Sequence, residues 1–194
     1  MTPGIAAAKH ALRRAMMAKR DALPAAVRAE AAQALVERAL QVLPVHGTIS
    51  AFWPMGSEID TRPVLRALYA RGHAVLLPRM QGRGLPLVFY PWSPGNVLEP
   101  GPFGVEQPRA DGAPVVPDVC LAPLLAFDSQ GYRLGYGGGF YDRTLAAWQA
   151  DGHEVTRVGL AYSEQEVEAV PHEAFDMPLH AVLTELGLRR LGAG

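Results

Sequence analysis

The amino-acid sequence predicts an α/β protein, a single three-layer α/β/α domain with a mostly parallel central sheet. The first observation is that short apolar runs with strand character alternate with helical segments, which is typical of a parallel sheet covered by helices. The second is the length of 194 residues, about that of one domain, with no internal repeat or low-complexity linker. We therefore expect residues 1–194 to form one domain.

Helical periodicity predicts four helices, at residues 5–20, 25–43, 61–71 and 140–150. Pro24 stands just before the second helix, where a first turn tolerates proline. Thr61 is expected to open the third helix, and Gly72 to close it. The fourth helix follows a glycine-rich loop.

Apolar runs predict strands at residues 48–53, 74–77, 87–90, 118–122, 155–162 and 181–184. Residues 93–117 are instead crowded with Pro and Gly. Neither flank of this stretch is large enough for a comfortable separate core, so we interpret it as a long functional loop rather than a linker.

Composition argues against several classes of protein. The formal net charge of -1 disfavours a general nucleic-acid binder, which is usually far more basic. Cys120 is the only cysteine, so no internal disulfide can form and a reducing compartment fits.

No apolar run is long enough to cross a bilayer, and the N-terminus lacks a secretory signal. The N-terminus has no acidic residue before Asp21, a composition that also occurs in mitochondrial transit peptides. A first helix that packs on the domain explains this composition better. We expect a cytoplasmic monomer without nucleic-acid or membrane partners.

The most informative segment is the glycine loop, residues 133–143, with the sequence RLGYGGGFYDR. Four glycines in five positions let the backbone approach a ligand or take positive φ. The loop opens a helix, whose free N–H groups and dipole favour phosphate. It is neither a P-loop nor the dinucleotide fingerprint, because no Gly-Lys-Ser/Thr follows and Phe140 replaces the last glycine. A tightly turning connector is the alternative, but Arg133, Arg143 and the aromatic residues favour phosphate.

Asp142 has two interpretations from its position in the first turn of the fourth helix. A carboxylate there complements the helix dipole and can cap the helix. It can also hold magnesium beside bound phosphates, because this cation prefers oxygen ligands. Spacing by itself slightly favours the structural role.

A basic stripe runs along the first helix. Lys9, Arg13 and Arg20 fall within roughly 40° of one another on a helical wheel and border its apolar face. The stripe is either a solvated surface with buried aliphatic stems or a helix face that carries Lys9 and Arg13 to a phosphate site.

Several motifs occur together in a specific order. The most specific is LAPLLAFD at residues 121–128, followed by GYRLGYGGGFYDR at 131–143. Weaker pieces are the basic first helix, FWPMGSEIDT at 52–61, FGVEQP at 103–108 and VPHEAFDMP at 170–178. Over nearly its whole length the chain resembles the 5-formyltetrahydrofolate cyclo-ligase family.

The resemblance implies an ATP- and magnesium-dependent conversion of 5-formyltetrahydrofolate to 5,10-methenyltetrahydrofolate. In that reaction the formyl oxygen attacks the γ-phosphate, the neighbouring folate nitrogen closes the ring, and phosphate leaves. Such chemistry depends on positioning and charge neutralisation rather than a protein nucleophile. No catalytic nucleophile is therefore expected, and Arg133 and Tyr136 are expected to position the reactants.

The resemblance also implies the site residues. ATP would be contacted by Lys9, Arg13, Arg133, Leu134, Gly135, Tyr136, Gly137, Gly138, Gly139, Phe140 and Tyr141. The folate substrate would be contacted by Trp53, Glu58, Tyr136 and Phe140. Magnesium would be held by Asp142 and Asp176.

Two positions depart from the family pattern. Some members have Lys where Gly138 stands, so a phosphate contact must here come from backbone or another cation. Some have an acid where His180 stands, which leaves it open whether Asp176 or the region of His180 completes the metal site. The histidines show no metal-ligand spacing, and we interpret all six as structural or surface residues.

Two alternatives come from other classes. One is a catalytically silent nucleotide- or nucleic-acid-binding relative, which would have lost Asp142, Arg133 or the glycines; this chain keeps them all. The other is a sugar-phosphate isomerase or CoA-transferase-like enzyme, which fold analogy alone supports.

Overall fold

The computed structural model describes residues 4–192, and its centre is a seven-stranded sheet in the order β11-β10-β9-β6-β1-β2-β3. The strands are β1 (Thr48–Ser50), β2 (Ala74–Met80), β3 (Leu87–Pro91), β6 (Val119–Pro123), β9 (Thr156–Leu160), β10 (Ala181–Thr184) and β11 (Gly187–Arg190). The five central strands pair in parallel, and the edge strands β3 and β11 pair antiparallel. The predicted fold class is confirmed.

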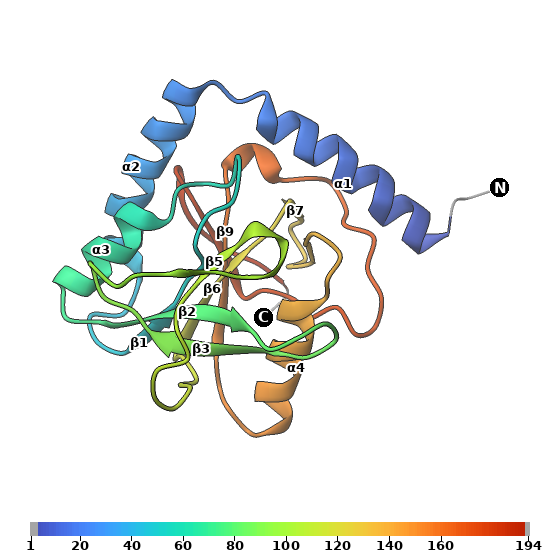
Figure 1. Ribbon diagram of the computed structural model, residues 1–194. Helices are drawn as coiled ribbons and strands as arrows, with labels where there is room; N and C mark the ends of the chain where they lie inside the picture. The colour runs from blue at the N-terminus through green and yellow to red at the C-terminus, as the bar shows by residue number, and fades with distance from the viewer. Residues whose placement is uncertain (1–3, 193–194) are drawn as a thin grey trace.

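The described residues form four α-helices (Figure 1): α1 (Ile5–Asp21), α2 (Ala25–Val42), α3 (Arg62–Ala70) and α4 (Phe140–Ala150). Helices α2 and α3 cover one face, and α4 covers the other. All four occur where periodicity predicts them, to within one or two residues. No helix in the described part of the chain is long and apolar enough to span a membrane.

The central strand β6 has apolar side chains on both of its faces, because both faces of the sheet are covered by helices. Leu121 packs into the core cluster beneath α2 and α3, whereas its neighbours Cys120 and Ala122 pack into the cluster beneath α4. Successive side chains of a strand point to opposite faces, so a sheet covered on both sides needs continuous apolar runs. Those runs are the signal that makes the central strands visible in the sequence.

Thr61 opens α3 from the N-cap position, as predicted, but its hydroxyl makes no cap hydrogen bond; it donates to the carbonyl oxygen of Phe52 at 2.6 Å and fastens the chain after β1. Other local predictions are wrong. Strand β1 ends at Ser50, three residues earlier than predicted. Residues 93–117 contain a small hairpin of β4 (Glu99–Pro100) and β5 (Glu106–Gln107), with a 3-10 turn, η1 (Pro102–Gly104), between them.

The hairpin of β7 (Ala126–Phe127) and β8 (Arg133–Leu134) was not predicted either, and it leads directly into the glycine loop. Helix α1 packs on this hairpin through Met16, which clusters with Leu125 and Leu134. In Figure 1, α1 lies outside the two layers that cover the sheet, beside β7 and the segment that follows β9. That segment begins with a 3-10 turn, η2 (Ser163–Gln165). The position of α1 brings its basic face to the glycine loop.

Candidate functional site

The glycine loop presents free backbone donors at the start of α4. Gly137 has φ +97° and Gly139 has φ +64°, in the left-handed region that glycine adopts without strain. Among the described residues, no N–H group of residues 136–142 donates a hydrogen bond to backbone or side chain. Unpaired N–H groups at a helix N-terminus bind anions, so the loop is suited to phosphate.

Helix α1 holds this loop from one side. Arg13 donates from Nε to the carbonyl oxygen of Gly135 at 2.9 Å. Two turns further along, Arg20 donates from one Nη to the Tyr136 hydroxyl at 2.7 Å. Lys9 and Arg20 are only 8% and 5% exposed, so the interpretation of the stripe as a solvated surface is wrong for both. The basic face of α1 is part of the interior of the site.

Lys9 joins the start of α1 to the loop before β10. Its ammonium lies 2.6 Å from an Asp176 carboxylate oxygen and 2.9 Å from Glu173. Burial disfavours the ammonium, but the hydrogen bonds and charges of Asp176 and Glu173 outweigh burial and raise the pKa of Lys9. Lys9 therefore stays charged and places a cation beside Asp176.

Arg133 joins the glycine loop to the same segment. One Nη donates to the carbonyl oxygen of Met177 at 2.7 Å, and the other to Asp142 Oδ1 at 2.9 Å. The same Asp142 oxygen accepts the Met177 N–H at 3.2 Å. Asp142 makes no helix cap, so the capping interpretation is wrong. Because Met177 follows Asp176, these contacts bring both predicted metal ligands to one place.

Glu58 and Tyr136 meet on the other side of the glycine loop. The Tyr136 hydroxyl donates to Glu58 Oε1 at 2.8 Å, and the Met55 N–H donates to Oε2 at 2.8 Å. Burial raises the pKa of Glu58, while the contacts with Met55 and Tyr136 and the charge of Arg20 oppose that rise. Burial also raises the pKa of the Tyr136 phenol, so the phenol stays protonated as a donor. A buried carboxylate with few partners is suited to accept hydrogen bonds from a ligand.

The other predicted site residues differ in how deeply they are buried and in what they contact. Trp53 is half-buried, 6.1 Å from Trp92 between ring centroids, with the Arg62 guanidinium 6.0 Å from its ring. Phe140 and Tyr141 pack against the cluster beneath α4. Leu134 is buried in the cluster beneath α1, so only its backbone faces the loop. The Gly138 N–H donates no hydrogen bond within the described part of the chain, but the Gly138 carbonyl oxygen accepts one from the Arg143 guanidinium at 2.6 Å.

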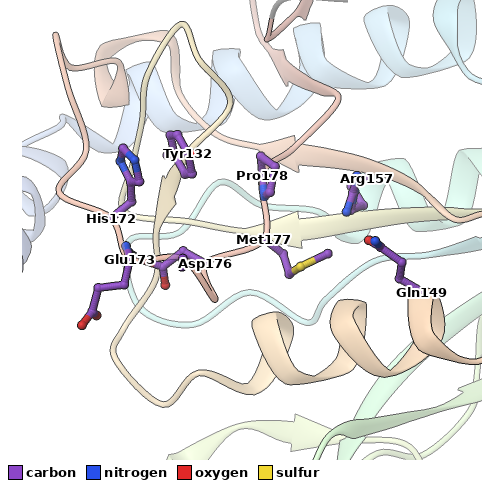
Figure 2. Close-up of a pocket in the computed structure, with 9 residues that line it drawn as sticks. Tyr132, Gln149, Arg157, His172, Glu173, Asp176, Met177 and Pro178 are labelled. Carbon is purple, nitrogen blue, oxygen red and sulfur yellow. Dashed lines mark hydrogen bonds between the residues drawn. The ribbon is translucent and has the colours of Figure 1, made fainter.

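A groove of about 620 Å³ opens beside these clusters (Figure 2). Glu173 and Asp176 lie at one end, Gln149 and Arg157 lie at the other, and Met177 lies between them. His180 contacts Arg157 at 2.7 Å and makes no hydrogen bond to Asp142 or Asp176 among the described residues.

The described residues contain no group of three or more His, Cys, Asp or Glu side chains arranged to hold a metal ion by themselves. The donor set nevertheless fits magnesium. Asp142 and Asp176 each accept their hydrogen bonds through one carboxylate oxygen, which leaves the second oxygen of each without a partner in the described chain. Magnesium is commonly bound by one or two carboxylates together with substrate phosphates.

Sequence reasoning missed three participants: Arg20, Ser57 and Glu173. Arg20 was visible as the third member of the basic stripe, on the same side of the helix as Lys9 and Arg13. Ser57 and Glu173 carry no signal of their own, because each matters only through a partner that is distant in the sequence.

The fold and this site define a class of α/β enzyme. In it, a glycine loop at a helix N-terminus lies between a buried carboxylate and a cluster of paired acids and cations. The 5-formyltetrahydrofolate cyclo-ligase family model matches residues 5–185, and the chain belongs to this ligase family.

Individual relatives agree with that family. The 5-formyltetrahydrofolate cyclo-ligase of Escherichia coli K12 is 39% identical over 142 residues, which are 71% of this chain and 77% of the relative. The enzyme of the same name from Mycolicibacterium smegmatis is 35% identical over 91% of this chain and 93% of its own length. The solved structure of Aquifex aeolicus 5,10-methenyltetrahydrofolate synthetase has a TM-score of 0.79 at 31% identity, covering 96% of this chain and 94% of that one.

Proposed function

We propose that the protein converts 5-formyltetrahydrofolate to 5,10-methenyltetrahydrofolate, with ATP as co-substrate and ADP and phosphate as products. The observation that carries the proposal is the glycine loop, whose free N–H groups lie between the buried Glu58 carboxylate and the Asp142–Asp176 cluster. A phosphate donor and a polar heterocycle can then meet across one loop. Membership of the family supports the same reaction.

In this proposal the formyl oxygen attacks the γ-phosphate and ADP leaves. The neighbouring folate nitrogen then attacks the activated carbon, and the C–O bond breaks as phosphate departs. Phosphorylation is required because an amide oxygen is otherwise a poor leaving group. The loop N–H groups, with Lys9, Arg13 and Arg133, hold the phosphates and stabilise the charge that develops on them.

Asp142 and Asp176 would hold magnesium through their free carboxylate oxygens, and the ion would neutralise phosphate charge there. Arg133 and Lys9 keep the two carboxylates in place through their hydrogen bonds. The role of Trp53 and Glu58 is to face the folate, with Glu58 accepting hydrogen bonds from the pterin. Single-domain organisation, a monomeric state, cytoplasmic location and the absence of nucleic-acid or membrane partners stay predictions.

The reaction itself is the first test. With both substrates and magnesium present, we expect the absorbance of methenyltetrahydrofolate to appear, accompanied by one ADP for each product formed. Omission of ATP or chelation of magnesium should abolish the signal. A protein that binds both substrates yet never forms the product would instead be the catalytically silent relative.

Replacement of Glu58 with Gln should weaken folate binding and spare ATP binding. Glutamine keeps the size of the side chain but removes the charge, so the expected rise in KM for 5-formyltetrahydrofolate is about tenfold or more. KM for each substrate, measured separately, checks this. Glu168→Gln is the matched control, because Glu168 is exposed and makes no hydrogen bond among the described residues. Equal losses for both substrates would contradict a role limited to the folate.

A further inference from the structure

Arg20 is a buried cation near the site that the phosphate chemistry described above does not use. It lies in the last turn of α1 and is 5% exposed. Nε donates to the Ser57 hydroxyl at 3.0 Å, and Nη2 donates to the Tyr136 hydroxyl at 2.7 Å. Nη1 is buried and has no partner among the described residues. Burial of a guanidinium is costly, so one without a direct carboxylate partner needs an explanation.

The contacts of Arg20 join three segments that are distant in the sequence. Ser57 lies next to Glu58, and its hydroxyl also donates to Asp21. Tyr136 lies in the glycine loop and donates to the Glu58 carboxylate at 2.8 Å. The Arg20 guanidinium also lies 5.6 Å from the centre of the Tyr136 ring. Arg20 thus holds the Tyr136 hydroxyl, which donates to the Glu58 carboxylate, and the side chain of Ser57, which precedes Glu58 in the sequence, without a hydrogen bond to the carboxylate itself.

We propose that Arg20 is a positioning residue for the folate side of the site, which fixes the Tyr136 hydroxyl and keeps Glu58 as a charged acceptor for the pterin. This inference rests on the proposed function, because it takes Glu58 as a substrate contact. Arg20 acts through Tyr136 and Ser57 and through its charge. It differs from Arg13, which contacts the glycine loop through the backbone of Gly135.

The charge of Arg20 matters because Glu58 is buried. Burial raises the pKa of Glu58, and the Arg20 charge opposes that rise, so removal of the charge moves the pKa further up. The other titratable or charged groups near Glu58 are Tyr136 in the glycine loop, Tyr141 at the start of α4, Tyr162 before η2, Asp21 on α1, and the ion pair of Asp60 with Arg62. The three tyrosines are neutral, because burial raises the pKa of each, and the Asp60–Arg62 pair is compensated within itself. Arg20 is therefore the cation that can keep Glu58 ionised.

The test is the pH dependence of folate binding in Arg20→Met, with Arg14→Met as the matched control. Arg14 lies on the same helix, is exposed, and makes no side-chain hydrogen bond among the described residues. In Arg20→Met we expect KM for 5-formyltetrahydrofolate to rise about tenfold at the acid end of the pH profile and to recover as the pH is raised and Glu58 loses its proton again. The parent and Arg14→Met should show no such slope. Quenching of tryptophan fluorescence by folate should give the same slope without turnover.

Two further variants separate charge from shape. Arg20→Lys keeps the charge, so its folate KM should not depend on pH in this way, although the altered contact with Tyr136 should raise it. The double variant Arg20→Met with Glu58→Gln should lose the slope, because glutamine does not titrate. Should Arg20→Met fail to fold, Arg20→Gln replaces it with the same expectation.

Each outcome decides the proposal. A folate KM in Arg20→Met that equals that of Arg14→Met at every pH would overturn it. A loss that is uniform across pH, with or without a lower melting temperature, would also overturn it, because the Arg20 charge would then not be what keeps Glu58 ionised. A parent protein that forms no methenyl product at all would instead defeat the proposed function, a result that is distinguishable before any variant is made.

Discussion

Replacement of Gly137 with Val is expected to abolish ATP binding at ordinary concentrations and to lower kcat/KM by about 100-fold or more. Gly137 has φ +97°, which a β-branched residue adopts only with strain. A Cβ at this position would also lie 3.3 Å from the guanidinium carbon of Arg13. The loop N–H groups and Arg13 would then be displaced together. Nucleotide titration by calorimetry, alongside kinetics, measures the effect.

Gly112→Val is the control for backbone strain. Gly112 has φ +86°, but a Cβ there would meet no atom within 4 Å, and the residue lies in the long loop before β6. We expect this variant to lose some stability and to bind ATP normally. Equal nucleotide affinity in Gly137→Val and Gly112→Val would exclude the glycine loop as the ATP site.

Replacement of Asp142 with Asn is expected to lower turnover at least about 100-fold while the melting temperature stays close to that of the parent. Asparagine keeps an oxygen that can accept the Met177 N–H and an Arg133 hydrogen bond, so the contacts of the folded state largely survive. It lacks the charge that holds magnesium beside phosphates. Turnover should recover in part as the magnesium concentration is raised.

The matched control for this prediction is Asp151→Asn. Asp151 lies at the opposite end of α4, is exposed, and makes no side-chain hydrogen bond among the described residues. It should leave both turnover and its magnesium dependence unchanged. An Asp142→Asn protein that melts early and still turns over at the parental rate would show that Asp142 serves the fold through Arg133 and Met177, and not the metal.

Much of the site could be predicted because its chemistry is concentrated in short segments. The glycine loop can be recognised from a short segment, because the glycines, the flanking arginines and the start of the following helix all fall within residues 133–143. The basic face of α1 is equally local, because helical geometry alone brings Lys9, Arg13 and Arg20 to one side. The roles of these residues toward ATP, folate and magnesium stay predictions until the variants are measured.

The partners of these residues could not be predicted in the same way. Lys9 pairs with Asp176, which is 167 positions away, and Arg20 reaches Tyr136 across 116 positions. Nothing in either residue specifies the other before the chain is folded. The sequence left two questions open: whether Asp142 caps its helix, and whether the basic stripe of α1 is solvated. Both depend on contacts between distant residues, such as Arg133 and Met177 with Asp142 and Asp176 with Lys9, so the sequence could not decide them.

The sequence by itself determined the helices, the buried parallel strands and the glycine loop, because hydrophobic period and glycine content act over a few residues. Tertiary structure alone decided the hairpin of β7 and β8 and the edge strand β11. Strands β7 and β8 have only two residues each, and β11 (Gly187–Arg190) is half exposed and carries two arginines, so none of them shows the apolar run that marks the buried strands. It also decided that the cations of α1 are buried. A lysine or an arginine loses its hydration only where folding supplies a carboxylate, a hydroxyl or a carbonyl oxygen, and those groups come from distant parts of the chain.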